Sequence, residues 1–273
     1  MEFLKNKKRQ IIQVVSAILY NLNFNGIKTK NIYQGDIKKI CIPGLNCYSC
    51  IGAISSCPLG SLQTSISNIK YNSFSFLVIG LIIIFSIILG RIICGFLCPF
   101  GLLQEILYKI KTKKIKKNKI TKKLTKIKYL ILILFVFIFS FILKSPSFCK
   151  FICPQGTLEA GIPLVILKKE LQKLIGKIFN LKIMILFIVI VGSIFLYRFF
   201  CSYICPLGAI YSLFNKISLF GVVVDNEKCI NCGQCIKICK MNINKVGDSE
   251  CIACGSCIKG CFKKAIKIKN RYI

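Results

Sequence analysis

The sequence contains no histidine and no tryptophan, and only nine of its 273 residues are acidic. Without imidazole, the chain cannot build a His-ligated haem, a Rieske-type cluster or a Cys/His zinc site. The shortage of carboxylates also leaves no group of acids that would indicate a catalytic centre, so we expect no catalytic residue. Glu105 and Glu159 each lie near a cysteine motif, and we expect Glu105 to face solvent at the edge of a membrane.

Long apolar segments are abundant, since 55% of the residues are hydrophobic and the mean hydropathy is +0.66. Three segments are clear and a fourth, shorter one is interrupted by polar residues: Phe74–Gly90, Tyr129–Leu143, Ile183–Tyr197 and the weaker Ile11–Phe24. A spanning helix needs about 20 apolar residues, and lipid requires the backbone to bond within its own segment. These segments predict a mainly α membrane protein with about four transmembrane helices, multi-pass in the cell membrane.

Basic residues outnumber acidic ones by 40 to 9, which gives a net charge of +31. The run Lys109–Lys128 holds 11 lysines and no acid, so the positive-inside rule predicts that it is cytoplasmic. The segment Lys144–Lys182 is then expected outside. If Ile11–Phe24 spans, Gly26–Asn72 is outside too, with the basic N-terminus as a retained anchor. Because lysine is abundant throughout the chain, we read the charge as compositional and expect no nucleic acid partner.

Cysteine spacing divides the chain into a transmembrane iron–sulfur domain, 1–220, and a small ferredoxin-like domain, 221–273. The second domain contains two copies of one pattern: Cys229-x₂-Cys232-x₂-Cys235-x₃-Cys239 and Cys251-x₂-Cys254-x₂-Cys257-x₃-Cys261. In this pattern three cysteines wrap one [4Fe–4S] cluster and the fourth reaches the other cluster. Structural zinc is the alternative, but zinc cysteines usually come as two separate pairs.

The pattern predicts two [4Fe–4S] clusters, and the segment resembles the bacterial two-cluster ferredoxins, which implies a small α+β domain. One set of ligands is Cys229, Cys232, Cys235 and Cys261; the other is Cys251, Cys254, Cys257 and Cys239. Gly233 and Gly255 fall between the second and third ligands, where the backbone must bend close to sulfur.

A second motif, Cys-Pro-x-Gly, recurs at the ends of the apolar segments. Its copies are Cys94/Cys98-Pro99-Phe-Gly101, Cys149/Cys153-Pro154-Gln-Gly156, Cys201/Cys205-Pro206-Leu-Gly208 and a partial copy, Cys57-Pro58-Leu-Gly60, preceded by Cys47 and Cys50. Cysteines four residues apart share one helical face, so each full copy offers two thiolates at the end of a spanning helix.

The predicted topology pairs these copies. Cys94, Cys98, Cys201 and Cys205 are expected on the inner side, where Arg91 and Arg198 would offset the charge of an inner cluster. An outer cluster would use Cys149, Cys153 and two of Cys47, Cys50 and Cys57, with Cys41 left over. Disulfides are the alternative outside, and simple packing of small apolar thiols is the alternative at both places.

Together, the Cys-x₃-Cys-Pro repeats and the two-cluster tail resemble the polyferredoxin-type membrane proteins. That group includes the membrane quinol-oxidising subunit of periplasmic nitrate reductase systems. The stretch Pro43-Gly-Leu-Asn-Cys47-Tyr-Ser-Cys50 is similar to the N-terminal loop of clostridial-type members. The resemblance covers about Cys41 to Cys261 and implies membrane electron transfer with [4Fe–4S] binding, but no particular substrate or partner.

We therefore expect a membrane-bound electron-transfer protein, an electron-transfer subunit and not a stand-alone enzyme. The tail would be cytoplasmic, and its ten Lys/Arg against four acids from Asp225 onward suggest an acidic donor, with an acceptor outside. A reductase for cofactor assembly and a redox sensor are the alternatives. A copper site for the former would have to use cysteine, and no DNA-binding or kinase segment supports the latter.

Overall fold

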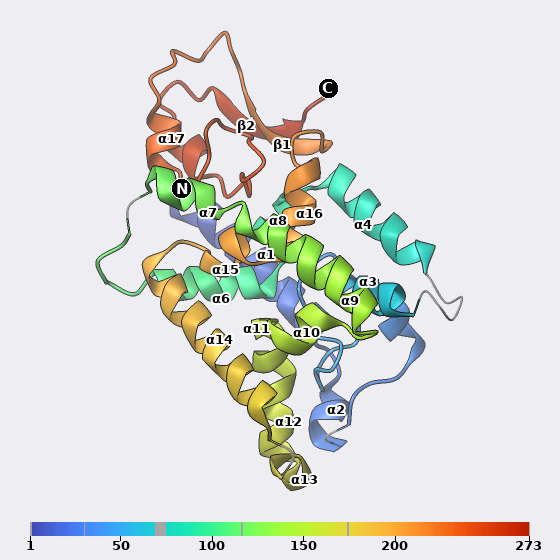
Figure 1. The fold of residues 1–273 in the computed structure, drawn as a ribbon. Helices are drawn as coiled ribbons and strands as arrows, with labels where there is room; N and C mark the ends of the chain where they lie inside the picture. The colour runs from blue at the N-terminus through green and yellow to red at the C-terminus, as the bar shows by residue number, and fades with distance from the viewer. Residues whose placement is uncertain (1, 30, 69–74, 116, 174, 273) are drawn as a thin grey trace.

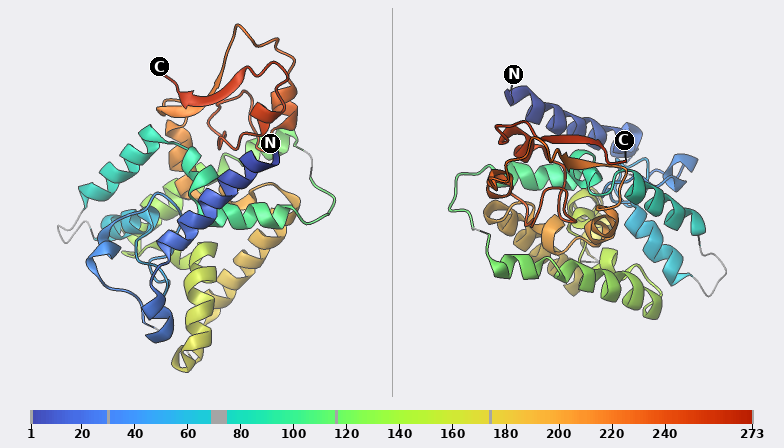
Figure 2. Two further views of the ribbon diagram at one scale, coloured as in Figure 1. Left: turned by 180° about the vertical axis from the view of Figure 1, so that it is seen from behind. Right: turned by 90° about the horizontal axis from the view of Figure 1, so that it is seen from above.

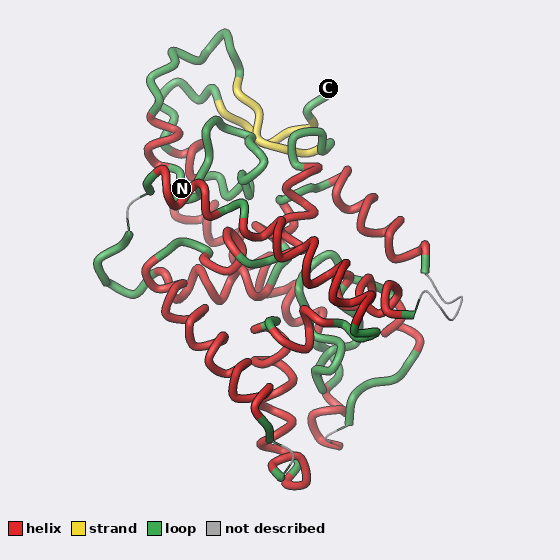
Figure 3. Tube along the Cα trace, viewed as in Figure 1, coloured by secondary structure: helices red, strands yellow, loops and turns green. Residues whose placement is uncertain are grey.

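The computed structural model describes residues 2–29, 31–68, 75–115, 117–173 and 175–272. The first residue of the predicted segment Phe74–Gly90 and the last residues of the predicted loop Gly26–Asn72 lie outside these ranges. The described chain is mostly helical, and strands occur only near the C-terminus (Figure 3). This agrees with the prediction from the sequence of a mainly α protein with a small α+β tail.

The N-terminal half is a series of helices, in which a long loop, residues 40–57, carries the N-terminal cysteines. Helix α1 packs against α5 and α6, and α3 packs against α4 and α9. The helices of this half are α1 (Glu2–Tyr20), α2 (Phe24–Thr29), the 3₁₀ turn η1 (Asp36–Lys39), α3 (Pro58–Ser67), α4 (Phe76–Ile88), α5 (Ile92–Phe96), α6 (Pro99–Tyr108) and α7 (Lys119–Leu124).

A second series of helices follows, of which Ile162–Leu167, Lys169–Gln172 and Lys177–Phe195 extend away from the tail (Figures 1 and 2). It contains α8 (Ile127–Ile131), the π-helical turn η3 (Leu132–Ile138), α9 (Phe139–Ile142), α10 (Ser147–Phe151), α11 (Pro154–Gly156), the π-helical turn η4 (Thr157–Gly161), α12 (Ile162–Leu167), α13 (Lys169–Gln172), α14 (Lys177–Phe195), α15 (Phe199–Tyr203) and α16 (Pro206–Phe214).

Two helices are long and apolar enough to cross a membrane, judged by length and composition: Lys119–Ile142 and Lys177–Phe195. The predicted segment Phe74–Gly90 forms a shorter apolar helix, Phe76–Ile88, and the predicted Ile11–Phe24 lies mostly within the helix Glu2–Tyr20. Of the four predicted spans, therefore, two meet these criteria within the described residues.

The tail forms a two-stranded antiparallel sheet with two short helices. Strand β1 (Phe220–Val224) pairs with β2 (Ile266–Asn270), with Val222 opposite Ile268. Helices α17 (Gln234–Ile238) and α18 (Ser256–Lys259) each begin after a glycine in the left-handed region, Gly233 with φ 69° and Gly255 with φ 80°. Glycine is favoured in this region because it has no Cβ. The cysteine spacing predicts such a bend of the backbone at both glycines.

The tail and the helical region share their core. Met241 and Ile252 of the tail pack in the same buried cluster as Phe100 and Phe200, and Ile92 packs against a second cluster formed by the tail. The cysteine loops of the tail are thus held directly against α5, where one copy of the Cys-Pro motif begins.

Candidate iron–sulfur sites

The Cys-Pro motif forms a turn between two helices. The first cysteine of each full copy lies on a five-residue helix, and the second is the N-cap of the next helix, with proline as its first residue; the caps are Cys57, Cys98, Cys153 and Cys205. We predicted that both cysteines share one helix, which is wrong. Proline has no N–H and clashes with the preceding turn, so the first helix ends, whereas proline suits the first position of a new helix.

Numbered in chain order, the four Cys-Pro copies are those of Cys57, Cys94/Cys98, Cys149/Cys153 and Cys201/Cys205. Four buried thiols converge between the second and fourth of these copies. Cys205 lies within electrostatic range of Cys94, Cys98 and Cys201. The same four side chains line a small cavity of about 10 Å³. We call this group, Cys94, Cys98, Cys201 and Cys205, the sealed site. It is the set that the sequence grouped on the inner side.

Two buried arginines form hydrogen bonds between the two copies that make up the sealed site. Arg91, before the first cysteine of one copy, donates to the carbonyl oxygen of Cys201 at 3.2 Å. Arg198, before the first cysteine of the other copy, donates to the carbonyl oxygen of Cys94. Each guanidinium thus holds the backbone of the opposite copy and brings a positive charge next to the thiols.

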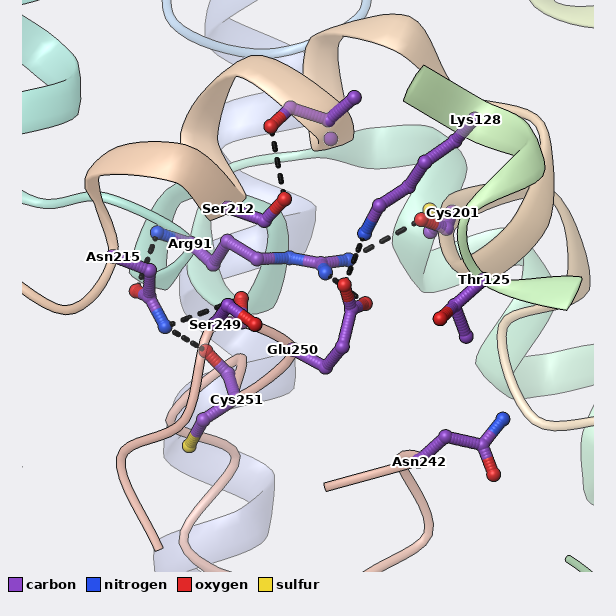
Figure 4. A network of polar contacts seen from close by, with 12 residues as sticks. Arg91, Thr125, Lys128, Cys201, Ser212, Asn215, Asn242, Ser249, Glu250 and Cys251 are labelled. Atoms are coloured by element: carbon purple, nitrogen blue, oxygen red, sulfur yellow. Dashed lines mark hydrogen bonds and ion pairs between the residues drawn. The ribbon is translucent and has the colours of Figure 1, made fainter. Parts of the chain in front are cut away.

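Each arginine is also paired with a buried carboxylate. The Glu250 carboxylate lies between Arg91 and Lys128 (Figure 4). Asn215 joins the same network, because its Oδ1 accepts from the backbone N–H of Arg91 and its Nδ2 donates to the Cys251 carbonyl. This network connects the sealed site to the tail.

Glu105 is buried, which contradicts its predicted exposure. Its side chain is only 4% exposed and forms ion pairs with Arg9 and Arg198, while the Tyr197 hydroxyl donates to it at 2.6 Å. Burial raises the pKa of Glu105, but the charge of Arg198 and the bonds and charge of Arg9 outweigh it and lower the pKa to about 2. The carboxylate is therefore charged because its partners come from distant parts of the chain.

A second group of four thiols forms between the first and third copies. Cys149 lies within electrostatic range of Cys47, Cys57 and Cys153, and all four line a cavity of about 840 Å³. We call this group, Cys47, Cys57, Cys149 and Cys153, the open site. It uses two of the three N-terminal cysteines that the sequence offered.

The remaining two N-terminal cysteines lie apart from the open cavity. Cys50 points toward Asn21, with its sulfur 3.8 Å from Oδ1, and Cys41 is buried with its sulfur 3.4 Å from the Ser61 hydroxyl. All eighteen cysteines are free thiols. Cys41 and Cys50 thus lie outside this group of four thiols.

One carboxylate connects the third copy to the N-terminal loop beside the open site. Glu159 accepts a hydrogen bond from the backbone N–H of Cys47 at 3.0 Å. Burial raises the pKa of Glu159 to about 7, although that hydrogen bond lowers it. Lys182 lines the cavity and donates to the Cys149 carbonyl at 3.3 Å.

The tail cysteines form two further groups. Cys229, Cys232, Cys235 and Cys261 line a cavity of about 680 Å³; we call them the first tail site. Cys257 lies within electrostatic range of Cys251, Cys254 and Cys239, and we call these four the second tail site. Both sets match those that the sequence grouped, including the exchange of the fourth cysteine between motifs.

The sealed and open sites are neighbours. Leu45 lines both cavities, and backbone hydrogen bonds of Leu45 and Asn46 reach Cys98 and Cys57 respectively. Fully buried Tyr211 also lies within electrostatic range of thiols from both sites and donates to the Pro43 carbonyl at 2.7 Å. A single loop therefore forms the wall between the two groups of thiols.

The donor sets suit [4Fe–4S] clusters, whose iron is held by four cysteine thiolates. The motif glycines bring the backbone close to the sulfurs: a Cβ on Gly60 would lie 3.8 Å from Cys149 Sγ, and one on Gly156 would lie 3.5 Å from Cys47 Sγ. In the part of the chain that the structure describes, no three Cys, Asp or Glu side chains are grouped closely enough to hold a single metal ion.

Comparisons with known proteins agree with these motifs. A family described as "4Fe-4S binding domain" matches residues 71–118, 128–169 and 179–222, and a second family of the same description matches residues 222–243. The first three stretches each contain one full copy of the Cys-Pro motif. The chain carries 4Fe-4S ferredoxin-type domains. The predicted iron–sulfur and ferredoxin-type nature is thereby confirmed.

Relatives with similar sequences occur in archaea and bacteria. The uncharacterized protein MJ0750 of Methanocaldococcus jannaschii is 34% identical over 169 residues, which cover 59% of this chain and 63% of the relative. The putative electron transport protein YccM of Escherichia coli is 23% identical over 59% of this chain and 44% of the relative. The methylamine utilization ferredoxin-type protein MauN of Methylorubrum extorquens is 26% identical over 67% and 59%.

The ferredoxin-type chain spans about half the length of the curated relatives that it matches. No solved structure matches it. Homology to ferredoxin-type electron transport proteins therefore rests on the sequence, and the arrangement of the sites rests on the structure described above.

Sequence reasoning missed several residues around the sites. Glu250 and Lys128 carried no motif, and no local signal could have found them. Gln63 and Gln104, in contrast, both occupy the sixth position after a Cys-Pro cysteine. Aligning the motif copies over a longer stretch would have found these two glutamines.

Proposed function

We propose that this ferredoxin-type chain is a membrane-bound electron-transfer protein with four [4Fe–4S] sites arranged in series. The observation that carries the proposal is that sixteen of the eighteen cysteines gather in four groups of four. When bound, such a cluster supplies one-electron chemistry without a proton donor from the protein. The chain itself provides the thiolates, the charges beside them and the order of the sites.

The contacts between neighbouring sites support this order. The first and second tail sites share one buried cluster, in which Cys235 and Cys261 pack beside Cys257. Gly95, next to a cysteine of the sealed site, lies against the Ile252 backbone of the second tail site, so that a Cβ there would be 2.2 Å from the Ile252 oxygen. Leu45 then separates the sealed site from the open site.

Two outward-facing apolar helices support location in a membrane. Only 22% and 17% of the apolar windows of Lys119–Ile142 and Lys177–Phe195 are buried. Large side chains on both face outward, namely Leu130, Ile133, Phe141, Ile142, Met184, Phe187 and Ile188. Exposed apolar surface of this extent is typical of contact with lipid.

The same helices link the levels of the two Cys-Pro sites. Lys128 contacts the network beside the sealed site, whereas Ser140, further along, donates to Gln63 beside the open site. Helix α14 returns, from Lys182 at the open site to its end before Arg198 at the sealed site. We propose that the two sites lie at different depths, so that the chain conducts electrons over part of a hydrocarbon core of about 30 Å.

We propose that the tail and the sealed site face the cytoplasm. The basic run and the tail are in contact: Lys117 donates to the Cys239 carbonyl, and Lys122 donates to Asn244 Oδ1 at 2.9 Å. The positive-inside rule assigns that run to the cytoplasm. Trypsin should therefore cleave the basic run in inside-out vesicles and spare it in intact spheroplasts; the reverse result would invert the orientation.

The first tail site presents a docking face to a soluble redox partner. Cys232 is exposed, and the apolar side chains beside it, Ile230 and Phe262, are 65% and 90% exposed. Lysines such as Lys237 and Lys263 surround them in the sequence and are exposed. We propose an acidic donor here, for which the rate of electron exchange should fall as ionic strength rises. A rate that does not depend on salt would contradict an acidic donor.

Anaerobic purification, iron and sulfide analysis and low-temperature EPR test the cluster assignment. Since each cluster contains four iron atoms, we expect about sixteen per chain, against about eight if only the tail sites are filled. Cys94→Ser and Cys149→Ser should each remove one cluster. The matched controls Cys41→Ser and Cys50→Ser, outside all four groups, should keep the full iron content. Zinc without sulfide would contradict the proposal.

A further inference from the structure

Two of the four Cys-Pro copies carry a glutamine at the same position. Gln63 is the sixth residue after Cys57, and Gln104 is the sixth residue after Cys98. Both lie on the second turn of the helix that begins at the motif proline, and both are fully buried. A buried amide must find hydrogen-bond partners for its oxygen and for both of its N–H groups.

Each glutamine directs its amide nitrogen at a sulfur of the partner copy. Gln63 Nε2 lies 3.3 Å from Cys149 Sγ in the open site. Gln104 Nε2 lies 3.1 Å from Cys201 Sγ in the sealed site. In both sites the sulfur belongs to the first cysteine of its copy. The contact is therefore repeated in two places that are far apart in the sequence.

The backbone fixes the orientation of these amides. Gln104 Oε1 accepts from the Phe200 N–H at 2.9 Å, and Nε2 also donates to the Phe100 carbonyl at 3.2 Å. A backbone N–H only donates and a carbonyl only accepts, so exchanging the oxygen and nitrogen would break both bonds. In the same way, Gln63 Oε1 accepts from the Phe148 N–H at 2.8 Å, and Gln63 Nε2 donates to the Leu59 carbonyl at 3.2 Å. The remaining N–H of each amide is thus directed at sulfur.

The other two copies lack this contact. At the same position Glu159 accepts from the backbone N–H of Cys47, and Tyr211 donates to the Pro43 carbonyl. Both side chains thus bond to the backbone of the N-terminal loop. Among the described residues, each of these two sites therefore has one side-chain amide donor to sulfur, supplied by the N-terminal copy of the pair. It adds to backbone donors such as the Gly156 N–H to Cys153 Sγ and the Gly208 N–H to Cys205 Sγ.

We infer that Gln63 and Gln104 are positioning residues that hold one ligand sulfur in each site and raise the reduction potential there by donating an N–H to it. The inference rests on the proposed function. A donated N–H stabilises negative charge on sulfur, and the reduced state carries more of that charge. Because both amides are buried and locked by backbone, the donor stays in place in either redox state.

Redox titration of the purified full-length protein, followed by EPR, tests this inference. Gln104→Glu should make the potential assigned to the sealed site more negative, and Gln63→Glu should do the same at the open site. We expect about a tenfold change in each reduction equilibrium, which is about 59 mV for one electron. Gln104→Met and Gln63→Met, which remove the donor without adding charge, should shift the potentials in the same direction by less.

Gln172→Glu is the matched control, because Gln172 is exposed and donates to the Val165 carbonyl. It should leave every potential unchanged. Variants with full iron content and unshifted potentials would overturn the inference, as would loss of iron without any shift. A wild-type protein with about eight iron atoms would instead overturn the proposed function at these two sites.

Discussion

The sealed and open sites are built from the same motif but differ in what surrounds the thiols. Around the sealed site, Arg91 and Arg198 bridge the two copies and pair with buried carboxylates, and the cavity measures about 10 Å³. Around the open site, the bridging charges are replaced by one Glu159–backbone bond and Lys182, and the cavity measures about 840 Å³. The two sites thus share the motif and differ in the charges beside the thiols and in the volume of the cavity that the thiols line.

The largest expected effect comes from removing a charge beside the sealed site. Glu105→Gln leaves Arg9 and Arg198 buried without their carboxylate, which should lower the free energy of unfolding by about 3–5 kcal/mol. Denaturation in detergent, followed by circular dichroism, measures this.

The control for that variant is Glu170→Gln, since Glu170 is exposed. It should change stability by less than about 0.5 kcal/mol. If both variants behaved alike, the ion pairs of the sealed site would not stabilise it.

The pH dependence of stability should report the same carboxylate. Its pKa is about 2 in the folded chain against an ordinary 4.5, so its contribution is complete above about 4.5 and is lost as pH falls toward 2. The loss should be on the order of 3 kcal/mol. In Glu105→Gln the decline of thermal stability over this range should be shallower; an identical decline would contradict the assignment.

Equivalent glycines of the motif offer a closer comparison of the two sites. A Cβ at Gly101 would lie 2.9 Å from Arg198 Nη1, whereas one at Gly60 would meet only ordinary contacts at 3.8 Å and beyond. Gly101→Ala should therefore destabilise the protein by about 1–3 kcal/mol. Gly60→Ala, in a helix, should be neutral or stabilise it by up to about 1 kcal/mol. Unfolding midpoints of the two variants measure the contrast, and equal losses would refute it.

The smallest expected effect is on the rate of iron loss. A chelator should remove the EPR signal of the open site about tenfold faster than that of the sealed site, a difference of about 1.4 kcal/mol in barrier. Cys94→Ser and Cys149→Ser each leave one of the two sites for separate measurement. Equal rates would show that closure of the cavity does not protect the sealed site.

Spacing was informative wherever the geometry is local. The four cysteines of each tail motif lie within eleven residues, and the turn at Gly233 follows from that spacing. The number of spanning helices was less predictable, because Phe76–Ile88 is apolar but short. Hydropathy alone does not distinguish a short span from a helix that packs against the rest of the molecule.

Charge pairing was not predictable. Arg9 meets Glu105 across 96 residues, and Arg91 meets Glu250 across 159. Such pairs depend on how the helices pack, and no local sequence pattern predicts them. The choice of Cys47 over Cys50 likewise depends on how the N-terminal loop closes over the third copy.

The motif copies pair alternately along the chain, the first with the third and the second with the fourth. The cysteine pairs of the two sites therefore alternate along the chain, and neither half of the protein contains all four cysteines of one site. During synthesis, the ligands at Cys57 and Cys98 must remain incomplete until the later copies have emerged. Any cut of the chain between residues 98 and 149 divides both sites at once.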